Sequence, residues 1–487
     1  MPDTAVSAEL LSRSRRPHLV GVAGAAMRSM AALLVALGRE VSGSDSGSAV
    51  DLAVLSNQGI RATHGHDAQN VADADLLIVS AAIPADNPEL AAARARGIPI
   101  LSHAQALGAL MATRDGIAVA GTHGKSTTTA LVAHLLAVAG RDPTLAGGAD
   151  ALDFGGYARL GHGPELVAEA DEFGRRFLEL HPRLAIITGV EPDHLDYYGS
   201  FEAVLTAFQQ FVDGMAPDGA VVTCEDEPNL ARLALARRRI RYGWAGHADW
   251  RLERFEPVQG GGAHFMVRRP DGCEATYQTL LSGRHNAANA VAALAIAHEL
   301  GVPDDAARAG LATFRGTRRR FETLARADGV WVVDDYAHHP TAVLANLAAA
   351  RDVHGGRLVC VFQPHTTHRA KSLLHEFAAA FGPADRVIVT PIYQPTGRSS
   401  GPPEITSAEL AARIEHADVV VASSLVDAYR LAERELRPGT LVVVFGAGDV
   451  TTVAARLAQA VRDRAASLQP VAETASTTSV AGAGVAR

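Results

Sequence analysis

The sequence has 487 residues, which is too long for a single hydrophobic core and indicates roughly two to four domains. Apolar residues make up 48% of the chain and charged residues 20%, a composition typical of a globular α/β protein. The formal net charge of −8 argues against nucleic acid as the main partner, and no apolar run reaches the roughly 18 to 20 residues of a membrane span.

The N-terminal segment and the cysteines indicate the cellular compartment of the protein. Residues 1–16 form a short polar lead without the apolar core of a secretory signal. The three cysteines, Cys224, Cys273 and Cys360, lie far apart and show no metal-binding spacing. A reducing compartment is the simplest inference, so we expect a cytoplasmic protein.

The first predicted domain covers residues 17–112. An apolar run from His18 reaches Gly21 and Gly24 and passes into a helix that ends near Leu37, and a second strand closes at Asp45. This pattern is typical of a nucleotide-binding βαβ unit, although alanines replace the glycines expected at 23 and 26, so that a plain βαβ turn explains it nearly as well. Runs at 76–79 and 98–101 alternate with helical stretches at 87–96 and 103–111, which predicts a parallel sheet.

A phosphate-binding loop opens the second predicted domain, residues 113–316. The apolar strand Ile117 to Ala120 runs into Gly121-Thr-His-Gly124-Lys125-Ser126, and a helix follows. Backbone N–H groups at a helix N-terminus favour a phosphate, Lys125 can reach the terminal phosphates, and the Ser126 hydroxyl can hold Mg²⁺. The alternative is a glycine turn that opens an ordinary helix, because Val119 stands where the full motif has its first glycine. Lysine occurs at only two positions, 125 and 371, which indicates that arginine would not serve in this loop.

The remaining pattern alternates strands and helices. Strands are predicted at 166–168, 184–188 and 220–223, a helix at 286–300, and an antiparallel insertion at 250–278. After the charged joint at 315–320, a third α/β domain is predicted over 317–466, with strands at 330–334, 357–362, 386–389, 419–422 and 440–445. Residues 467–487 lack periodicity and are interpreted as a disordered tail.

Polar residues follow several predicted strands. Glu169-Ala-Asp-Glu172 and Glu191-Pro-Asp-His194 come after neighbouring strands of the second domain, where α/β proteins place ligands, and they suggest magnesium sites beside the phosphate loop. The alternative for each is a solvated acidic loop. In the third domain, Asp334-Asp-Tyr-Ala-His-His-Pro340 favours a site, while Arg319-Arg-Phe-Glu322 on its own reads as a charged linker. His365 and His368 could form a metal pair, but zinc is weakly supported without cysteine or glutamate between them.

The order and spacing of these motifs resemble the Mur ligase family, and within it most closely the branch that joins L-alanine to UDP-N-acetylmuramate. Nine motifs carry the resemblance, and they span about 18 to 460: Val41-Ser-Gly-Ser-Asp45, Gly121-Thr-His-Gly-Lys-Ser126, Glu169-Ala-Asp-Glu172, Glu191-Pro-Asp-His-Leu-Asp-Tyr-Tyr198, His285-Asn-Ala-Ala-Asn289, Arg319-Arg-Phe-Glu322, Asp334-Asp-Tyr-Ala-His-His-Pro340, Phe362-Gln-Pro-His365 and Phe445-Gly-Ala-Gly-Asp449. The resemblance implies an α/β fold of three domains, each built on a mainly parallel sheet: a Rossmann-like domain for the UDP-sugar, a P-loop-type ATPase domain, and a Rossmann-like domain for the amino acid. It also implies ATP and Mg²⁺ as cofactors and an acyl phosphate intermediate.

Site residues follow from the resemblance position by position. The expected catalytic residues are Lys125, His194 and Arg320, and the expected Mg²⁺ ligands are Ser126, Glu169 and His194. ATP is expected to contact Gly121, Thr122, His123, Gly124, Lys125, Ser126, Thr127, His285, Asn289, Arg320, Asp334 and Asp335. The UDP-sugar is expected to contact Gly21, Gly24, Ser44 and Asp45, and the amino acid Tyr336, His338, His365 and Arg369.

Several positions depart from the family pattern. The first loop reads Gly21-Val-Ala-Gly-Ala-Ala-Met-Arg-Ser29, in which two or three of the family's glycines are missing and Arg28 adds a charge that can pair with the diphosphate. Ala337 replaces a glycine, Thr367 replaces a tyrosine, and the segment after Glu172 differs. Two alternatives therefore remain: a related ligase with a different acceptor or amino acid, such as a peptide-recycling enzyme, and a nucleotide-binding regulator without catalysis. The expected partners are small molecules, with no nucleic acid and no membrane span, and the expected state is a monomer or weak homodimer.

Overall fold

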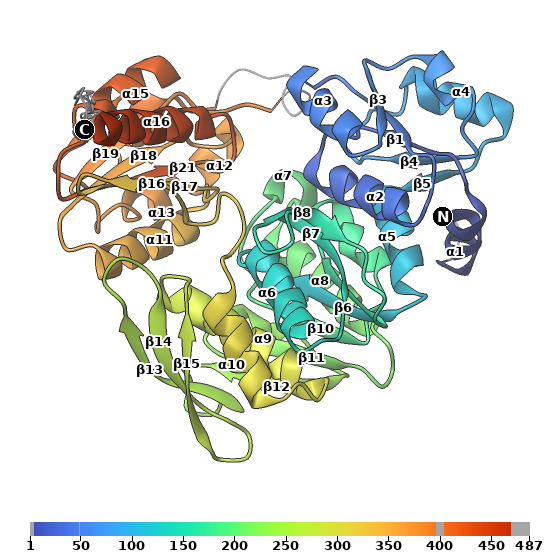
Figure 1. Cartoon of the computed structure of the whole chain (residues 1–487), viewed down its shortest axis with the longest axis horizontal. Coiled ribbons are helices and arrows are strands. Elements are labelled where there is room, and N and C mark those ends of the chain that lie inside the picture. The colour runs from blue at the N-terminus through green and yellow to red at the C-terminus, as the bar shows by residue number, and fades with distance from the viewer. Residues whose placement is uncertain (1–3, 48, 396–403, 469–487) are drawn as a thin grey trace, which may run out of the picture.

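The structure is a computed structural model that describes residues 4–47, 49–395 and 404–468. Within these residues the chain forms three α/β domains, each around its own sheet (Figure 1). The N-terminal domain lies at the upper right of that view, the central domain in the middle and the C-terminal domain at the upper left. The predicted fold class is therefore confirmed, whereas the domain limits placed at 112 and 316 stay predictions.

The N-terminal domain has a five-stranded parallel sheet of order β3-β2-β1-β4-β5. Its strands are β1 (Pro17–Val20), β2 (Ser42–Asp45), β3 (Arg61–His64), β4 (Leu76–Val79) and β5 (Ile100–Ser102). Its helices are α2 (Ala25–Ala36), α3 (Ala49–Asn57), η1 (Ala68–Val71), α4 (Pro88–Arg96) and α5 (His103–Met111). The central strands β1 and β4 are buried along their whole length, as a parallel sheet requires, whereas β2 and the edge strand β3 are polar.

The segment interpreted as a polar lead contains a helix. Helix α1 (Thr4–Arg13) packs against α5 and buries Leu11 in the core of the protein. Ser14 donates a hydrogen bond to Asp75 over 2.6 Å, which ties the end of this helix to the sheet domain. The segment predicted only as a short polar lead therefore forms a packed helix, which one buried leucine and a side-chain hydrogen bond anchor.

The central domain has a ten-stranded sheet of order β15-β14-β13-β12-β11-β10-β6-β9-β7-β8. Its strands are β6 (Asp115–Ala120), β7 (Thr144–Ala151), β8 (Gly156–Arg159), β9 (Glu165–Glu169), β10 (Leu184–Ile187), β11 (Ala220–Cys224), β12 (Arg238–Gly243), β13 (Trp250–Pro257), β14 (Ala263–Arg268) and β15 (Glu274–Thr279). Its helices are α6 (Lys125–Val138), η2 (Phe173–Glu179), α7 (Leu195–Tyr198), α8 (Phe201–Asp213), η3 (Pro228–Arg232), α9 (Arg284–Glu299) and α10 (Asp304–Thr313). Strands β13, β14 and β15 pair antiparallel, which confirms the predicted insertion at 250–278.

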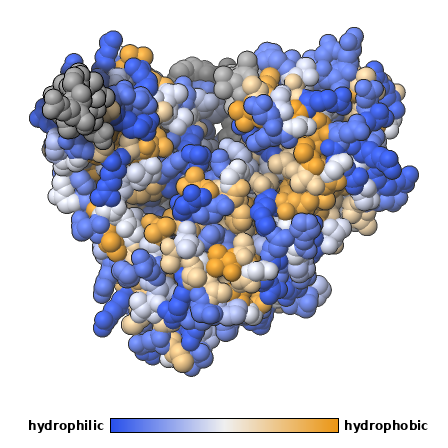
Figure 2. Space-filling model, viewed as in Figure 1, coloured by the Kyte–Doolittle hydropathy of each residue, from blue (hydrophilic) through white to orange (hydrophobic). Residues whose placement is uncertain are grey.

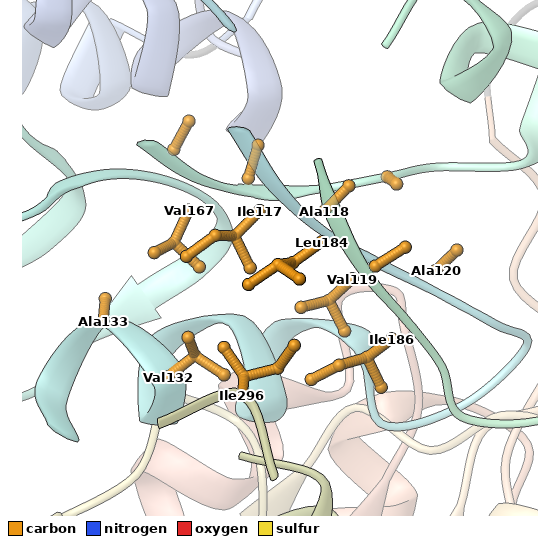
Figure 3. Close-up of a cluster of buried hydrophobic side chains, with 14 of the residues drawn as sticks. Ile117, Ala118, Val119, Ala120, Val132, Ala133, Val167, Leu184, Ile186 and Ile296 are labelled. Atoms are coloured by element: carbon orange, nitrogen blue, oxygen red, sulfur yellow. The ribbon is translucent and has the colours of Figure 1, made fainter. Parts of the chain in front are cut away.

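The core of the central domain lies between the sheet and helices α6 and α9. Val119 of β6 and Ile186 of β10 face Val132 of α6 and Ile296 of α9 (Figure 3). Each of these four side chains is at most 1% exposed. Burying one such aliphatic side chain stabilises the fold by about 1.5–3 kcal/mol, so this packing holds β6 and α6 rigidly at the two ends of the phosphate loop.

The C-terminal domain has a six-stranded sheet of order β16-β17-β21-β18-β19-β20, in which only the β16 pairing is antiparallel among the described residues. Its strands are β16 (Glu322–Ala327), β17 (Val330–Asp335), β18 (Arg357–Phe362), β19 (Arg386–Val389), β20 (Val419–Val421) and β21 (Thr440–Phe445). Its helices are α11 (Pro340–Val353), α12 (Thr367–Ser372), α13 (Leu374–Ala378), α14 (Ser407–Ala411), α15 (Leu425–Glu433) and α16 (Thr451–Leu468). Helix α16 includes residues 467 and 468, and the rest of the predicted tail lies outside the described residues.

The antiparallel insertion also links two domains. The N–H of Gly260 at the β13–β14 turn donates to the carbonyl of Val353 over 3.0 Å, and the Arg326 guanidinium donates to the Gly260 carbonyl over 2.7 Å. The central domain therefore contacts the C-terminal domain here as well as through the chain connection.

The surface seen in Figure 2 is mostly hydrophilic with small, scattered apolar patches. Among the described residues, no helix has both the length and the apolar character that a bilayer crossing requires.

Candidate active site

The phosphate loop joins the end of β6 to the start of α6. Gly121 has φ +127°, and a Cβ there would lie 2.1 Å from the Thr188 hydroxyl. Gly124, the residue before α6, has φ +80°, and a Cβ there would lie 2.8 Å from the Asn289 side chain. Both positions therefore require glycine. The backbone of the loop closes tightly over the first turn of α6, which is the geometry that exposes N–H groups to an anion.

Lys125 is held in place by oxygen atoms. Its ammonium donates to the carbonyl of Gly121 over 2.6 Å and lies 2.8 Å from Glu172 Oε2. Burial disfavours the charge, but the carboxylates of Glu172, Asp171 and Glu169 more than offset this and raise the pKa of Lys125. Burial raises the pKa of Glu172 to about 7, against the opposing effect of the Lys125 charge. The loop therefore keeps a cation ready at the start of α6.

Two strand ends flank this loop. Strand β6 pairs with β9 on one side and with β10 on the other, so that the segments after both strands reach the same edge of the sheet. Glu169, the last residue of β9, accepts a hydrogen bond from the N–H of Gly148 over 3.1 Å. His194 follows β10 with φ +54°, and burial lowers its pKa despite the nearby charge of Asp193. A non-glycine residue held at positive φ is the kind of backbone strain found at functional sites.

The C-terminal domain supplies the opposite wall. Arg369 donates to the carboxylate of Asp193 over 2.7 Å, and this ion pair crosses between the two domains. The charge of Arg369 overcomes the effect of burial and keeps the pKa of Asp193 far below its ordinary value. The rings of His338 and His365 lie 5.2 Å apart, centroid to centroid. An arginine fork beside two imidazoles suits the carboxylate and amine of an amino acid.

Arg320 connects the two walls. Its guanidinium lies 3.4 Å from the Ser126 hydroxyl of the phosphate loop and 4.7 Å from the centre of the Tyr336 ring. The Tyr336 N–H donates to the Arg319 carbonyl over 2.7 Å, so the two segments are fixed to each other. The joint at 315–320, which alone reads as a charged linker, thus places a cation directly at the phosphate loop.

One cavity of about 530 Å³ brings most of the predicted residues together. From the predicted ATP, metal and amino-acid sets its lining includes Thr122, His123, Gly124, Lys125, Ser126, Thr127, Glu169, His194, His285, Asn289, Arg320, Asp335, Tyr336, His338, His365 and Arg369. Gly121 and Asp334 lie behind the lining. Asp334 is buried and accepts a hydrogen bond from the Thr451 hydroxyl of α16 over 2.6 Å. Asp335 accepts the N–H of Phe321 over 2.6 Å and so holds the backbone directly after the joint. His365 and His368 do not converge, because His368 pairs with Glu404.

A second cavity of about 430 Å³ lies between the N-terminal and central domains. Of the predicted UDP-sugar residues only Gly24 is in its lining. Asp45 accepts hydrogen bonds from the N–H groups of Ala23 and Gly47, each over 2.8 Å, and the Ser44 hydroxyl donates to the buried Glu89 over 2.6 Å. Asp45 therefore shapes the first loop from behind, whereas the Ser44 side chain is directed to Glu89 of α4. Arg28 donates to the carbonyl of Ala23 over 2.7 Å and so folds back onto the same loop.

The structure adds residues that the predicted set lacks. Glu172 anchors Lys125, Asp193 anchors Arg369, and Asp171 and Arg176 line both cavities. Glu172 and Asp193 belong to the acidic motifs that follow β9 and β10, so the sequence pointed to the right segments. The signal that could have selected them is the need of each buried cation for a carboxylate.

Three protein-family models match consecutive parts of the chain. The model described as "Mur ligase family, catalytic domain" matches residues 16–115, "Mur ligase middle domain" matches residues 119–297, and "Mur ligase, glutamate ligase domain" matches residues 319–448. The three matches follow the order of the three sheets.

Individual relatives give the same result over nearly the whole chain. A UDP-N-acetylmuramate–L-alanine ligase from an Anaeromyxobacter species is 42% identical, and the match covers 92% of this chain and 98% of that protein. The solved UDP-N-acetylmuramate-alanine ligase MurC of Thermotoga maritima has a TM-score of 0.78 at 28% identity and covers 92% of this chain and 99% of that chain. A murein peptide ligase from Psychrobacter arcticus has a TM-score of 0.68 at 26% identity, with coverages of 92% and 98%.

Proposed function

This chain belongs to the Mur ligase family, and we propose that it joins L-alanine to the lactyl carboxylate of UDP-N-acetylmuramate, with ATP as the energy source, in the synthesis of peptidoglycan precursors. It is an ATP-dependent ligase that forms an amide bond. The relatives that are about 42% identical carry the L-alanine ligase name, which favours this substrate over the acceptor of a peptide-recycling enzyme.

The observation that supports the proposal most strongly is the shared cavity. The phosphate loop of the central domain and the residues Tyr336, His338, His365 and Arg369 of the C-terminal domain line the same space of about 530 Å³. A ligase has to bring a nucleotide phosphate, a carboxylate and an amine together, and a site between domains achieves this by positioning each reactant from a different side.

The residues fit a reaction through an acyl phosphate. A carboxylate is a poor electrophile, and transfer of a phosphoryl group from ATP gives it a leaving group. Lys125, fixed by Glu172 and two carbonyl groups, would stabilise the negative charge on the transferred group, and Arg320 would do so from the opposite wall. These contacts exist before substrate binds, so little reorganisation is needed during the reaction.

Magnesium fits the predicted ligands. The Ser126 hydroxyl and the Glu169 carboxylate offer the oxygen atoms that this hard cation prefers, and burial lowers the pKa of His194, which keeps its ring neutral. Mg²⁺ at these residues would neutralise charge on the ATP phosphates. The narrow space between Glu169 and Gly148, where a Cβ would lie 2.5 Å from the carboxylate, holds this ligand in one orientation.

The amino acid would bind against the C-terminal wall. Arg369 presents a guanidinium fork for the carboxylate of L-alanine, and burial together with the charges of Arg369 and His365 keeps the pKa of His338 well below its ordinary value. A neutral imidazole at that point can accept a hydrogen bond from the incoming amine. Asp193 occupies Arg369 until the amino acid arrives.

The test measures phosphate release by the purified protein with ATP, Mg²⁺ and UDP-N-acetylmuramate, and with L-alanine, glycine, L-serine or no amino acid. We expect release that depends on both the sugar nucleotide and L-alanine, together with a new amide product identified by mass. Release with another amino acid or only with a peptide would show a changed acceptor. Absence of release with every amino acid, despite ATP binding, would contradict the proposal.

A further inference from the structure

Three side chains to which the proposed reaction assigns no catalytic or magnesium-binding role meet at the wall of the larger cavity, where the central and C-terminal domains touch. His123 comes from the phosphate loop, Glu191 from the segment after β10, and His339 from the residue that precedes α11. Glu191 Oε2 lies 3.5 Å from His123 Nε2 and 3.5 Å from His339 Nδ1. If one ring nitrogen is taken from each histidine and one carboxylate oxygen from Glu191, these three atoms all lie within 4.8 Å of one another.

His339 is the most informative of the three. Its side chain is only 5% exposed, and neither ring nitrogen has a hydrogen-bond partner among the described residues. The buried Nε2 of His123 also lacks such a partner there. A buried imidazole without hydrogen-bond partners destabilises the fold, so a ligand that uses these nitrogens would stabilise the structure.

We propose that His123, Glu191 and His339 form a binding site for a divalent transition metal such as Zn²⁺, shared between the central and C-terminal domains. Two imidazoles and one carboxylate are a donor set that suits zinc, cobalt or nickel rather than Mg²⁺, which prefers oxygen ligands. Ligands about 2.0 Å from a tetrahedral Zn²⁺ lie roughly 3.3 Å apart, so the two separations of 3.5 Å need only a small contraction.

The surroundings favour a cation. Burial lowers the pKa of His339 to about 4, and the geometry places its Nδ1 3.5 Å from Glu191 Oε2. Burial and the Glu191 charge raise the pKa of the neighbouring Glu227, which indicates that two carboxylates repel each other here. Thr341 donates to Glu191 Oε2 over 2.8 Å, and such a contact orients a ligating carboxylate. An anion is disfavoured, because the Glu191 carboxylate stands between the two rings.

The site is separate from the predicted magnesium ligands Ser126, Glu169 and His194, with which it shares no residue. It links the phosphate loop to the N-terminus of α11, so a bound metal would favour the arrangement in which the two domains meet. The inference does not depend on the identity of the amino acid or of the sugar nucleotide.

The test uses the full chain without a histidine tag, freed of metal by chelation and titrated with Zn²⁺ and with Co²⁺ in an excess of Mg²⁺. We expect one equivalent of Zn²⁺ to bind, and Co²⁺ to give the intense visible absorption of a site with few ligands. His339→Ala, Glu191→Gln and His123→Ala should each weaken Zn²⁺ binding about 10- to 100-fold or more, since even changes to residues around a metal ligand have effects of that size. His123 is the most exposed of the three, with 32% of its side chain accessible, so His123→Ala should keep the fold intact if the buried substitutions do not.

Two control variants separate this site from others. His162→Ala removes an exposed histidine that pairs with Asp142, and it should leave Zn²⁺ affinity unchanged. His194→Ala removes a predicted magnesium ligand and should also leave Zn²⁺ affinity unchanged. If His194→Ala abolishes the binding while His339→Ala and His123→Ala retain it, or if all variants bind Zn²⁺ like the wild type, the proposal is wrong.

Discussion

The cavity between the central and C-terminal domains is lined largely by charged and imidazole side chains, whereas the cavity beside the N-terminal domain is lined mainly by small and apolar residues of α2 and α5. In the first cavity two of the cations are paired with a carboxylate, as Lys125 is with Glu172 and Arg369 with Asp193. In the second, the loop after β1 is shaped by hydrogen bonds to its backbone from Asp45 and Arg28. In the first cavity these two cations are held by side chains, while the loop predicted to bind the sugar nucleotide is held through its main chain.

The largest effect should come from Lys125, the centre of the cavity built from charged side chains. Lys125→Ala should lower ATP turnover by on the order of 10³-fold or more, because it removes a fixed positive charge beside the transferred phosphoryl group. Lys125→Arg should fail nearly as badly, since a guanidinium cannot take the place of an ammonium that lies between the Gly121 carbonyl and Glu172. Steady-state phosphate release measures both.

Lys371, the other lysine of the chain, provides the matched control. Its side chain is 59% exposed and lies 4.0 Å from Glu404. Lys371→Ala should therefore keep wild-type turnover. Retained turnover in Lys125→Ala would contradict the assignment of the phosphate loop. The larger cavity would then not depend on a fixed cation at that loop.

A second effect concerns the amino acid. Arg369→Ala should raise the KM for L-alanine about 10- to 100-fold and leave ATP binding unchanged, because a charge-assisted hydrogen bond contributes about 1.5–3 kcal/mol. His368→Ala is the control, since this neighbouring side chain is 46% exposed and pairs with Glu404. An unchanged KM in Arg369→Ala would mean that Arg369 serves only to hold Asp193 and thereby the two domains.

The predictable part of the molecule is the part that depends on local sequence. Strand β4 was predicted with the bounds found in the structure, because Leu76 to Val79 is a continuous buried apolar run. Strand β7 was missed, since two glycines interrupt its sequence and its support comes from pairing with β9. The ion pair of Asp193 with Arg369 joins residues 176 positions apart, so only the folded chain shows it.

The candidate site also contains some residues that local sequence predicts and others that only the folded chain places. The glycines and Lys125 of the phosphate loop have a local motif, and the sequence was enough to find them. The positive φ angles of His194 (+54°) and Phe321 (+51°) have no local signal, because surrounding contacts impose them. The roles of Ser44 and Asp45 also depend on the fold, since both side chains point to partners within the N-terminal domain.

The cavity beside the N-terminal domain can be probed through its backbone. Gly21 has φ +86°, and a Cβ there would lie 2.9 Å from Ser80 Cβ, so Gly21→Ala should destabilise the domain by about 1–2 kcal/mol. Gly24 has φ −67°, and a Cβ there would meet only the Gly21 carbonyl oxygen at 3.6 Å. Gly24→Ala should therefore keep the thermal midpoint and raise the KM for UDP-N-acetylmuramate about tenfold, which corresponds to roughly one lost hydrogen bond.

Thermal unfolding and substrate kinetics on both variants separate stability from binding. If Gly24→Ala changes neither the midpoint nor the KM, the loop backbone does not approach the sugar nucleotide. In that case the second cavity would not bind the sugar nucleotide through the main chain, and side chains such as Arg176 would have to hold the substrate instead.

The smallest expected effect concerns the way in which the free energy of unfolding changes with pH. It arises from Glu172 in the cavity built from charged side chains. Burial raises the pKa of Glu172 from 4.5 to about 7 in the folded protein, so between these values the folded state binds a proton that the unfolded state has released. The free energy of unfolding should therefore fall as pH rises from about 4.5 to about 7. Lys125 keeps its charge throughout, because its pKa is raised above its ordinary value.

Glu172→Gln removes this titration. The variant should be less stable than the wild type at each pH, because Lys125 loses its partner, but its thermal midpoint should decline with pH by a few °C less. Glu9→Gln, at a carboxyl of α1 with 66% of its side chain exposed, is the control and should keep the wild-type slope. Parallel curves for wild type and Glu172→Gln would mean that Glu172 is ionised throughout. The pair with Lys125 would then be an ion pair at every pH of the series, and the Glu172 charge would hold the cation at the phosphate loop throughout.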